Sequence, residues 1–159
     1  MYIINMVMKM DLSERLGFLV NDVARIYGAQ FDRQARERIG LSRAQCRVLG
    51  TLAMHGEPLS QAELAHRLDL TPMAVGGLCD RLVAGGWLDR RPSATDRRAY
   101  EIQLAPNAEK ALEAAMLISD EIQAHALSDL SVAERAQLTA LLGRVRCTLL
   151  ATDAKEAQA

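Results

Sequence analysis

The sequence predicts a mainly α-helical fold that contains one small β-hairpin. Apolar residues recur at helical spacing in several stretches, each bounded by capping residues or glycine. After Gly85-Gly86, the pattern changes to the alternation of a half-buried strand, with Tyr100, Ile102 and Leu104 on one side. The 159 residues are 50% hydrophobic and 25% charged, so we expect one globular domain over residues 1–159.

The cysteines and the first residues predict a protein of the reducing cytoplasm. Cys46, Cys79 and Cys147 are odd in number and form no CxxC pair, so neither a disulfide framework nor a zinc site is indicated. The apolar start, MYIINMVMKM, lacks a basic region and a cleavage site, and is too short to span a bilayer. We therefore expect no signal peptide and no membrane partner.

The first long helix is predicted over residues 12–38. Its length would be about 40 Å at 1.5 Å per residue, which is long for a small domain. We expect its apolar stripe to pack partly against a second subunit, and we expect Gly40 to end it. The stripe consists of Leu12, Leu16, Leu19, Val20, Val23, Tyr27 and Phe31.

The next helix is predicted to begin with a capping box, in which Ser42 and Gln45 satisfy free amides at the helix start. It should run to about His55. The break Gly56-Glu57-Pro58 follows, and Pro58-Leu59 could form a minor first strand.

Two short helices and a hairpin are predicted between residues 60 and 104. Ser60 and Glu63 form a second capping box. Thr71 is a good N-cap, and Pro72 suits the first helical position, where its missing N–H is harmless. Gly85-Gly86 should end the second helix, because glycine adopts the left-handed conformation without penalty.

The hairpin is predicted to start at Trp87-Leu88 and to return through residues 100–104. Its loop is basic, because residues 87–100 hold Arg90, Arg91, Arg97 and Arg98 against two aspartates. The whole chain has a net charge of −1, so positive charge is concentrated at this loop.

Two further helices are predicted after the hairpin. Pro106 suits the first position of a helix to about Ala126, and Ser131 with Glu134 forms a third capping box. From Thr152 onward we expect the tail to fray. The last helix has an apolar face of Leu138, Leu141, Leu142, Val145 and Leu149.

The stretch from Ser60 to Leu104 resembles the winged helix-turn-helix of the MarR family of bacterial transcriptional regulators, closest to its SlyA-like members. The run Leu82–Trp87 (LVAGGW), Arg90 and the triplet Asp96-Arg97-Arg98 carry the resemblance, which extends over roughly residues 12–150. It implies a winged helix-turn-helix DNA-binding region at residues 42–104. It also implies a homodimer, built from helices at 12–38 and 106–150, on a palindromic double-stranded operator.

The resemblance makes the helix from Thr71 to Ala84 the recognition helix. The family usually has hydroxyl and basic residues where Ala74, Gly76 and Gly77 stand, so base reading by hydrogen bonds is in doubt here. Two glycines inside a helix cost about 1 kcal/mol each relative to alanine. They could allow close approach of the helix backbone to DNA or tight packing against a neighbouring helix, or they could reflect sequence drift without a function.

The resemblance also assigns roles to the arginines of the hairpin loop. Arg98 would enter the minor groove while Asp96 holds its guanidinium, and Arg97 and Arg91 would bind phosphates. The alternative is a solvated basic loop. The residues expected to bind DNA are Ser60, Gln61, Thr71, Pro72, Met73, Ala74, Gly76, Gly77, Arg81, Arg91, Asp96, Arg97 and Arg98.

Many members of the family bind small phenolic or aromatic carboxylates between the dimer helices and the winged unit. The residues that could line such an effector site are Tyr27, Phe31, Arg43, Met54, His55 and Met73, although each could instead be plain core or surface. The three histidines share no ligand spacing, and we find no convincing catalytic motif. We expect no metal, no cofactor and no enzymatic activity.

The sequence therefore predicts a dimeric transcription repressor that a small ligand releases from its operator. One alternative is a winged domain that binds protein rather than specific DNA, and another is a redox-responsive regulator. Against the redox alternative, the three cysteines fall at helical positions flanked by apolar residues, where thiols are usually buried and inert.

Overall fold

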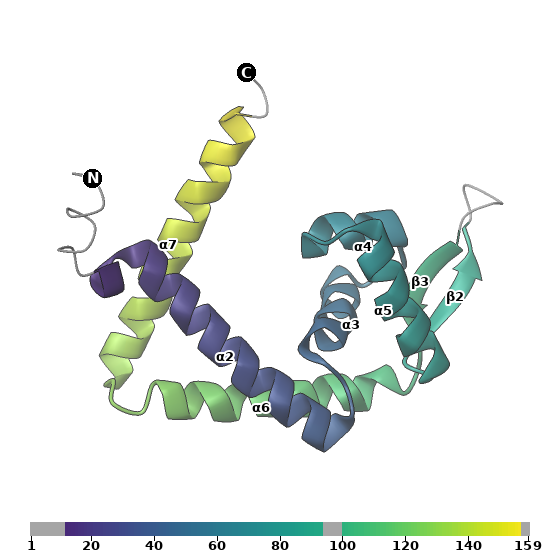
Figure 1. Ribbon diagram of the computed structural model, residues 1–159, viewed down its shortest axis with the longest axis horizontal. Helices are drawn as coiled ribbons and strands as arrows, with labels where there is room; N and C mark the ends of the chain where they lie inside the picture. The colour runs from purple at the N-terminus through teal and green to yellow at the C-terminus, as the bar shows by residue number, and fades with distance from the viewer. Residues whose placement is uncertain (1–11, 94–99, 157–159) are drawn as a thin grey trace, which may run out of the picture. The chain divides into compact units, whose positions relative to one another are not determined.

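The computed structural model describes residues 12–93 and 100–156, which form helices and one small sheet (Figure 1). The predicted wing residues Asp96, Arg97 and Arg98 lie outside the described residues. The chain divides into two compact units, one up to Asp120 and the other from Glu121 onward, and each is described by itself.

The first helix starts later than the sequence predicts. Leu12–Glu14 form a short 3-10 turn, η1, and the helix α2 covers Leu16–Ile39 after a break at Arg15. Arg15 has extended backbone and provides no side-chain cap. Gly40 ends α2 in the left-handed conformation with φ of 70°, as predicted.

The helices α3 (Arg43–His55) and α4 (Gln61–Leu68) begin with the two predicted capping boxes. The Ser42 hydroxyl accepts from the Gln45 amide at 3.3 Å, and the Gln45 side chain accepts from the Ser42 amide at 2.9 Å. Ser60 accepts from the Glu63 amide at 3.2 Å, and Glu63 accepts in return at 2.9 Å. Both starts are therefore fixed by residues within one helical turn.

The helix α5 covers Pro72–Ala84 and ends at the predicted glycine pair. The two glycines have different roles. A Cβ on Gly85 would lie 2.8 Å from the Trp87 indole, so that position must stay small. Gly86 supplies the left-handed conformation, with φ of 72°. The chain can therefore turn sharply from α5 into the hairpin.

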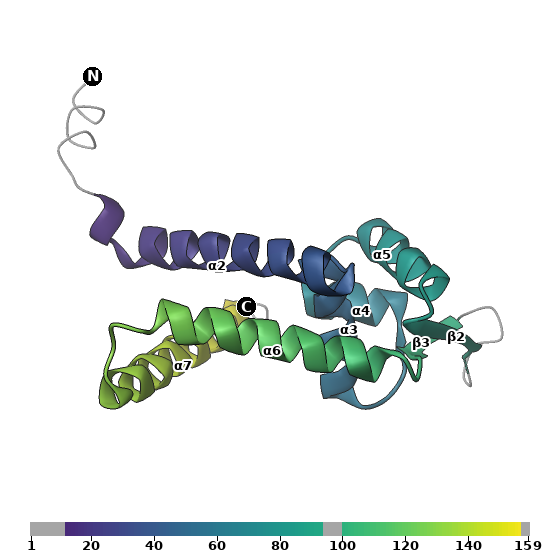
Figure 2. The same ribbon diagram turned by 90° about the horizontal axis from the view of Figure 1, so that it is seen from below.

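Three antiparallel strands in the order β1-β3-β2 complete the first unit: β1 (Leu59–Ser60), β2 (Leu88–Pro92) and β3 (Tyr100–Leu104). Ile102 is fully buried between Leu59 and Arg90. Tyr100 is 60% exposed, contrary to the predicted inward alternation, because it pairs with Pro92 at the outer end of the hairpin. The hairpin projects beyond the neighbouring helices (Figure 2).

The helix α6 covers Ala108–Ala126 and begins after Pro106 rather than at it. The Ala105 amide is held by the Trp87 carbonyl at 3.1 Å, and a turn to the Ala108 amide follows. The chain therefore leaves the sheet through a turn before the helix starts.

The helix α7 covers Val132–Glu156 and begins with the predicted capping box of Ser131 and Glu134. It continues through Thr152, where the sequence predicts fraying.

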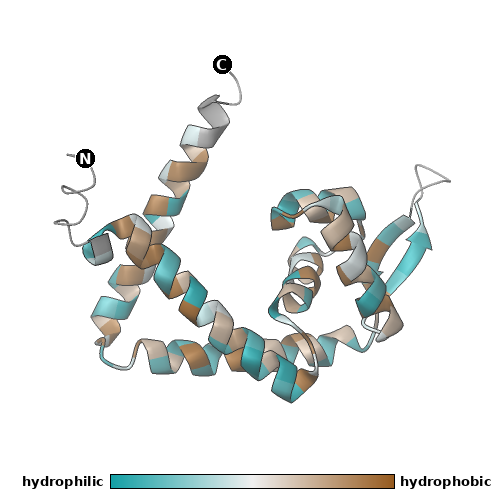
Figure 3. Cartoon of the chain, viewed as in Figure 1, coloured by the Kyte–Doolittle hydropathy of each residue, from teal (hydrophilic) through white to brown (hydrophobic). Residues whose placement is uncertain are grey.

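The core of the first unit lies where α3, α4 and α5 meet the sheet. Its fully buried side chains include Leu49, Leu59, Leu64, Val75, Leu82, Leu88 and Ile102. By contrast, large apolar side chains stay exposed along α2 and α7, where brown segments recur in Figure 3. They are Leu16, Phe18, Leu19, Val20, Val23 and Ile26 on α2, and Leu138, Leu141, Leu142, Val145, Leu149 and Leu150 on α7. One copy of the chain leaves this apolar surface uncovered.

Candidate nucleic-acid interface

The helix α5 buries one face and leaves the start of the other face open. Val75, Leu78, Cys79 and Leu82 are buried in the unit. Met73 on the opposite face is 86% exposed. The predicted contact residues Thr71, Pro72, Ala74 and Arg81 are exposed as well, so α5 presents its N-terminal half to solvent.

The glycines of α5 are not required by packing. A Cβ on Gly77 would have no atom within 4 Å, and one on Gly76 would meet only the Gln61 Oε1 at 3.7 Å. The single contact at Gly76 is an ordinary van der Waals distance and does not exclude a methyl group. Tight packing of these two glycines against a neighbouring helix of the described chain is therefore wrong, while close approach to DNA remains a prediction and sequence drift its alternative.

Helix-capping bonds occupy two of the predicted contact hydroxyls. Thr71 Oγ1 accepts from the Ala74 amide at 3.2 Å. The Ser60 hydroxyl donates to the Glu63 Oε2 at 2.7 Å and accepts from the Glu63 amide. Donation to the Glu63 carboxylate from the Ser60 hydroxyl, and then from the Ser60 amide, lowers the pKa of the Glu63 carboxyl. Both hydroxyls therefore stabilise helix starts in the protein without DNA.

An ion pair ties the hairpin to α5. Arg90 on β2 contacts the Asp80 carboxylate on α5. Backbone bonds add to it, because the Trp87 amide donates to the Leu82 carbonyl at 2.9 Å. The sequence reasoning missed Asp80, whose role depends on how the hairpin packs against α5.

Within the hairpin, Arg91 is paired across the strands with Glu101. Nε and Nη2 of Arg91 both lie 3.1 Å from the Glu101 Oε2, and the Ser93 hydroxyl donates to Oε1 at 2.9 Å. The Arg91 charge is thus partly neutralised inside the chain. Glu101 was missed as well, although the register of a hairpin places it opposite Arg91.

The predicted effector residues are placed in more than one region. The Tyr27 hydroxyl lies 2.7 Å from the Ser119 hydroxyl on α6. A Cβ on Gly28 would overlap the Arg43 guanidinium, so Arg43 lies close to the same turn of α2. Phe31 is half-buried one turn further along α2.

The other predicted effector residues lie elsewhere. His55 is at the far end of α3, about 18 Å along the helix from Arg43, next to Met54, which is 85% exposed. Met73 is on α5. Within one chain, Tyr27 and Arg43 both lie at one turn of α2, because Arg43 contacts the neighbouring Gly28, but the six residues do not gather around one point.

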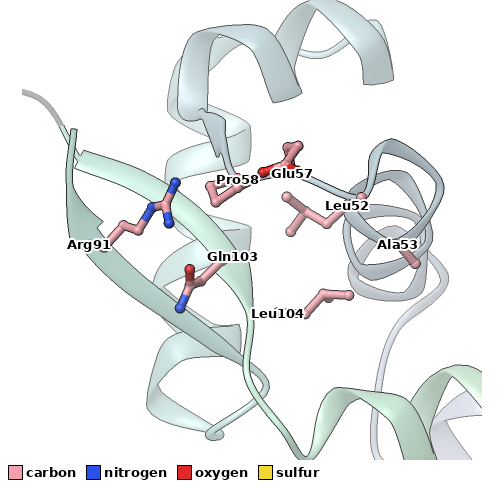
Figure 4. A pocket seen from close by; sticks show the side chains of 8 residues that line it. Leu52, Ala53, Glu57, Pro58, Arg91, Gln103 and Leu104 are labelled. Atoms are coloured by element: carbon pink, nitrogen blue, oxygen red, sulfur yellow. The ribbon is translucent and has the colours of Figure 1, made fainter. Parts of the chain in front are cut away.

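A separate pocket of about 400 Å³ lies between the end of α3 and the hairpin (Figure 4). Leu52 and Ala53 come from α3, and Arg91 and Gln103 come from the two hairpin strands. Gly56, Glu57, Pro58 and Leu104 complete the lining. None of the predicted effector residues belongs to it.

Two of the three cysteines are buried, and one is not. Burial raises the pKa of the Cys46 thiol to about 11, and burial also raises the pKa of Cys79. Cys147 is exposed on α7, contrary to the prediction. It lies about 180° around the helix from Leu138, because each residue turns the helix by roughly 100°. The apolar stripe therefore does not shield it.

Residues 12–93 and 100–156 contain no cluster of three metal-binding side chains. No helix in the described part of the chain combines the length and hydrophobicity that crossing a membrane requires.

Three helices, a projecting hairpin and a short first strand define this unit as a winged helix-turn-helix. The model of the MarR family matches residues 39–99, which span α3, β1, α4, α5 and β2 and end just before β3. In sequence, the chain is similar to the MarR family of transcriptional regulators over this unit.

The HTH-type transcriptional regulator PecS from Dickeya dadantii is 34% identical over 113 residues, which are 66% of this chain and 64% of PecS. The HTH-type transcriptional repressor MdtR from Bacillus subtilis is 31% identical over 104 residues, covering 65% of this chain and 66% of MdtR. The matched part thus spans just under two thirds of each relative.

The crystal structure of the Staphylococcus aureus MepR–DNA complex has the same fold, with a TM-score of 0.69. It is 26% identical and covers 84% of this chain and 97% of MepR. The predicted fold class, mainly α with a winged helix-turn-helix, is confirmed.

Proposed function

We propose that the protein is a homodimeric transcriptional regulator that binds a palindromic double-stranded operator. The observation that carries the proposal is the open N-terminal half of α5 beside a hairpin that is tied to it through Arg90 and Asp80. This arrangement suits a helix in the major groove with a wing over the neighbouring minor groove. The DNA-bound structure of MepR, which shares the fold, supports it.

The exposed apolar faces of α2 and α7 support a dimer. A soluble monomer rarely leaves so many large apolar side chains uncovered on two helices. A two-fold dimer would place two copies of α5 roughly 34 Å apart, one helical turn of DNA. Light scattering on a size-exclusion column should give a mass near twice 17.5 kDa at micromolar concentration. A monomeric mass would contradict the dimer.

The experiment that tests DNA binding is a gel shift with the DNA that flanks the gene for this chain. We expect a discrete complex that unlabelled specific duplex displaces and that unrelated DNA does not displace. Equal competition by unrelated DNA would instead favour the alternative function, a winged module that binds protein.

We further propose that the regulator is a repressor that a small ligand, such as an aromatic carboxylate, releases from DNA. The name of MdtR, a repressor, supports the direction of control. Tyr27 and Arg43 near one turn of α2 supply an aromatic ring and a cation of the kind that such a ligand needs. Adding salicylate to the complex should lower DNA binding in wild type and less in Arg43→Ala. No effect of salicylate on the complex would exclude salicylate as the ligand.

Release by oxidation is the weaker alternative. The buried Cys46 thiol, with a pKa of about 11, is almost entirely protonated at neutral pH and is therefore a poor nucleophile. The described thiol that solvent reaches is Cys147, on α7 rather than on the winged unit.

A further inference from the structure

Gln61 lies against the flank of α5 although it belongs to α4. It is the first residue of α4, and its Oε1 is the only described side-chain atom that a Cβ on Gly76 would meet, at 3.7 Å. The missing side chain of Gly76 thus leaves space that the amide of Gln61 borders. A polar group from the neighbouring helix is presented where α5 itself has only a hydrogen atom.

The carboxamide of Gln61 is not used by the fold. The side chains of the nearby Ser60 and Glu63 form the hydrogen bonds of the capping box. Within the described ranges, no hydrogen bond or ion pair involves the Gln61 side chain, which is half-buried rather than fully solvated. Its amide therefore keeps a donor and an acceptor available side by side.

The open half of α5 has no comparable group. The Thr71 hydroxyl caps the helix, and Met73, Ala74 and Gly77 cannot form side-chain hydrogen bonds to a base edge. Adenine is read in the major groove by a side chain that donates to N7 and accepts from the N6 amino group, as asparagine and glutamine do. Gln61 has this chemistry next to the helix that lacks it.

We propose that Gln61 is the residue that reads an adenine in each half-site, in place of a side chain on α5. The proposal rests on the proposed function, because it needs α5 in the major groove. In it, the Gln61 Nε2 donates to adenine N7 and Oε1 accepts from the N6 amino group. Met73 and Ala74 then add apolar contacts only.

The test is selection of binding sites from a random duplex library by wild type, Gln61→Ala and Gln61→Glu. We expect wild type to select a palindrome with one adenine per half-site that Gln61→Ala no longer prefers, while the other positions stay the same. Gln61→Glu should shift that position toward cytosine, because a carboxylate accepts from the cytosine N4 amino group and cannot donate to N7. An acidic residue at the start of α4 suits the helix dipole, so this variant should fold.

A second measurement isolates the contact. Replacing the selected adenine by 7-deazaadenine removes the N7 acceptor and leaves the pairing of the base intact. The affinity of wild type, measured by fluorescence anisotropy, should then fall by roughly 5- to 150-fold, the range for one specific side chain–base pair. Gln61→Ala should bind both duplexes alike.

The matched control is Gln103→Ala, which removes the same side chain from β3, where Gln103 lines the pocket of Figure 4. It should retain the adenine preference of wild type. An unchanged preference in Gln61→Ala, or no penalty from 7-deazaadenine in wild type, would overturn the role of Gln61. If wild type selected no sequence at all, the proposed function would fail instead.

Discussion

The substitution Gly77→Ala should stabilise the protein and weaken its binding to DNA. Alanine is favoured over glycine inside a helix by about 1 kcal/mol. Because the new methyl group would meet no atom within 4 Å, no packing strain offsets this gain. A gain of about 1 kcal/mol corresponds to a rise in Tm of roughly 2–4 °C for a domain of this size.

The effect on DNA should have the opposite sign if the backbone of α5 approaches the duplex closely. A methyl group forced into a packed contact costs about 1–3 kcal/mol, or roughly 5- to 150-fold in affinity. Calorimetry and fluorescence anisotropy on the same preparation measure the two effects.

The control is Gly50→Ala on α3, another helical glycine with no atom within 4 Å of its added Cβ. It should raise Tm by a similar amount and leave DNA affinity unchanged. If Gly77→Ala also left DNA affinity unchanged, close approach at this glycine would be refuted.

Three further outcomes are expected. Arg98→Ala should weaken operator binding by about 1–3 kcal/mol per subunit and flatten the salt dependence by about one charge. Arg91→Ala should weaken binding less, because Glu101 already pairs with the Arg91 charge. Equal small losses of affinity from the two substitutions would end the minor-groove assignment of Arg98. Iodoacetamide should modify Cys147 well before Cys46 in the native protein, as mass spectrometry of digests would detect, and the opposite order would contradict the burial described above. Arg36 and the Arg43 amide hold the pKa of Asp32 below its ordinary value of 3.8. The Asp32 carboxylate therefore stabilises the fold above that pH and loses this effect as the pH falls through its lower folded-state pKa. Asp32→Asn should lower the free energy of unfolding by about 1 kcal/mol or less at pH 7, and urea titrations at acid pH should show a smaller difference from wild type.

The sequence was most informative where structure is decided within one helical turn. The capping boxes at Ser42, Ser60 and Ser131 are confirmed, because donor and acceptor are three residues apart and need no tertiary context. The start of α6 was predicted wrongly because it depends on a contact between residues far apart in the sequence. The turn after Ala105 depends on its bond to Trp87, which the hairpin register sets.

The candidate interface was only partly predictable. The helix α5 and the strands followed from periodicity, but the pairing of Arg90 with Asp80 requires knowing how the hairpin packs on α5. The position of Gln61 beside Gly76 joins two helices and leaves no periodic signal in the sequence. The exposure of Cys147, by contrast, could have been predicted from the sequence. Its spacing from Leu138 alone places it on the opposite side of the helix from the apolar stripe.

The tie between Arg90 and Asp80 has a consequence for how the winged unit would meet a duplex. Because α5 and β2 are joined by this pair and by the bond from Trp87 to Leu82, they form one body rather than two independent arms. When α5 enters the major groove, the hairpin is already close to the neighbouring minor groove, so its effective concentration there is high. Asp80→Ala would remove the ion pair and leave the bond from Trp87 to Leu82, so it would loosen the coordination between the two grooves even though it also removes a carboxylate that would repel the phosphates.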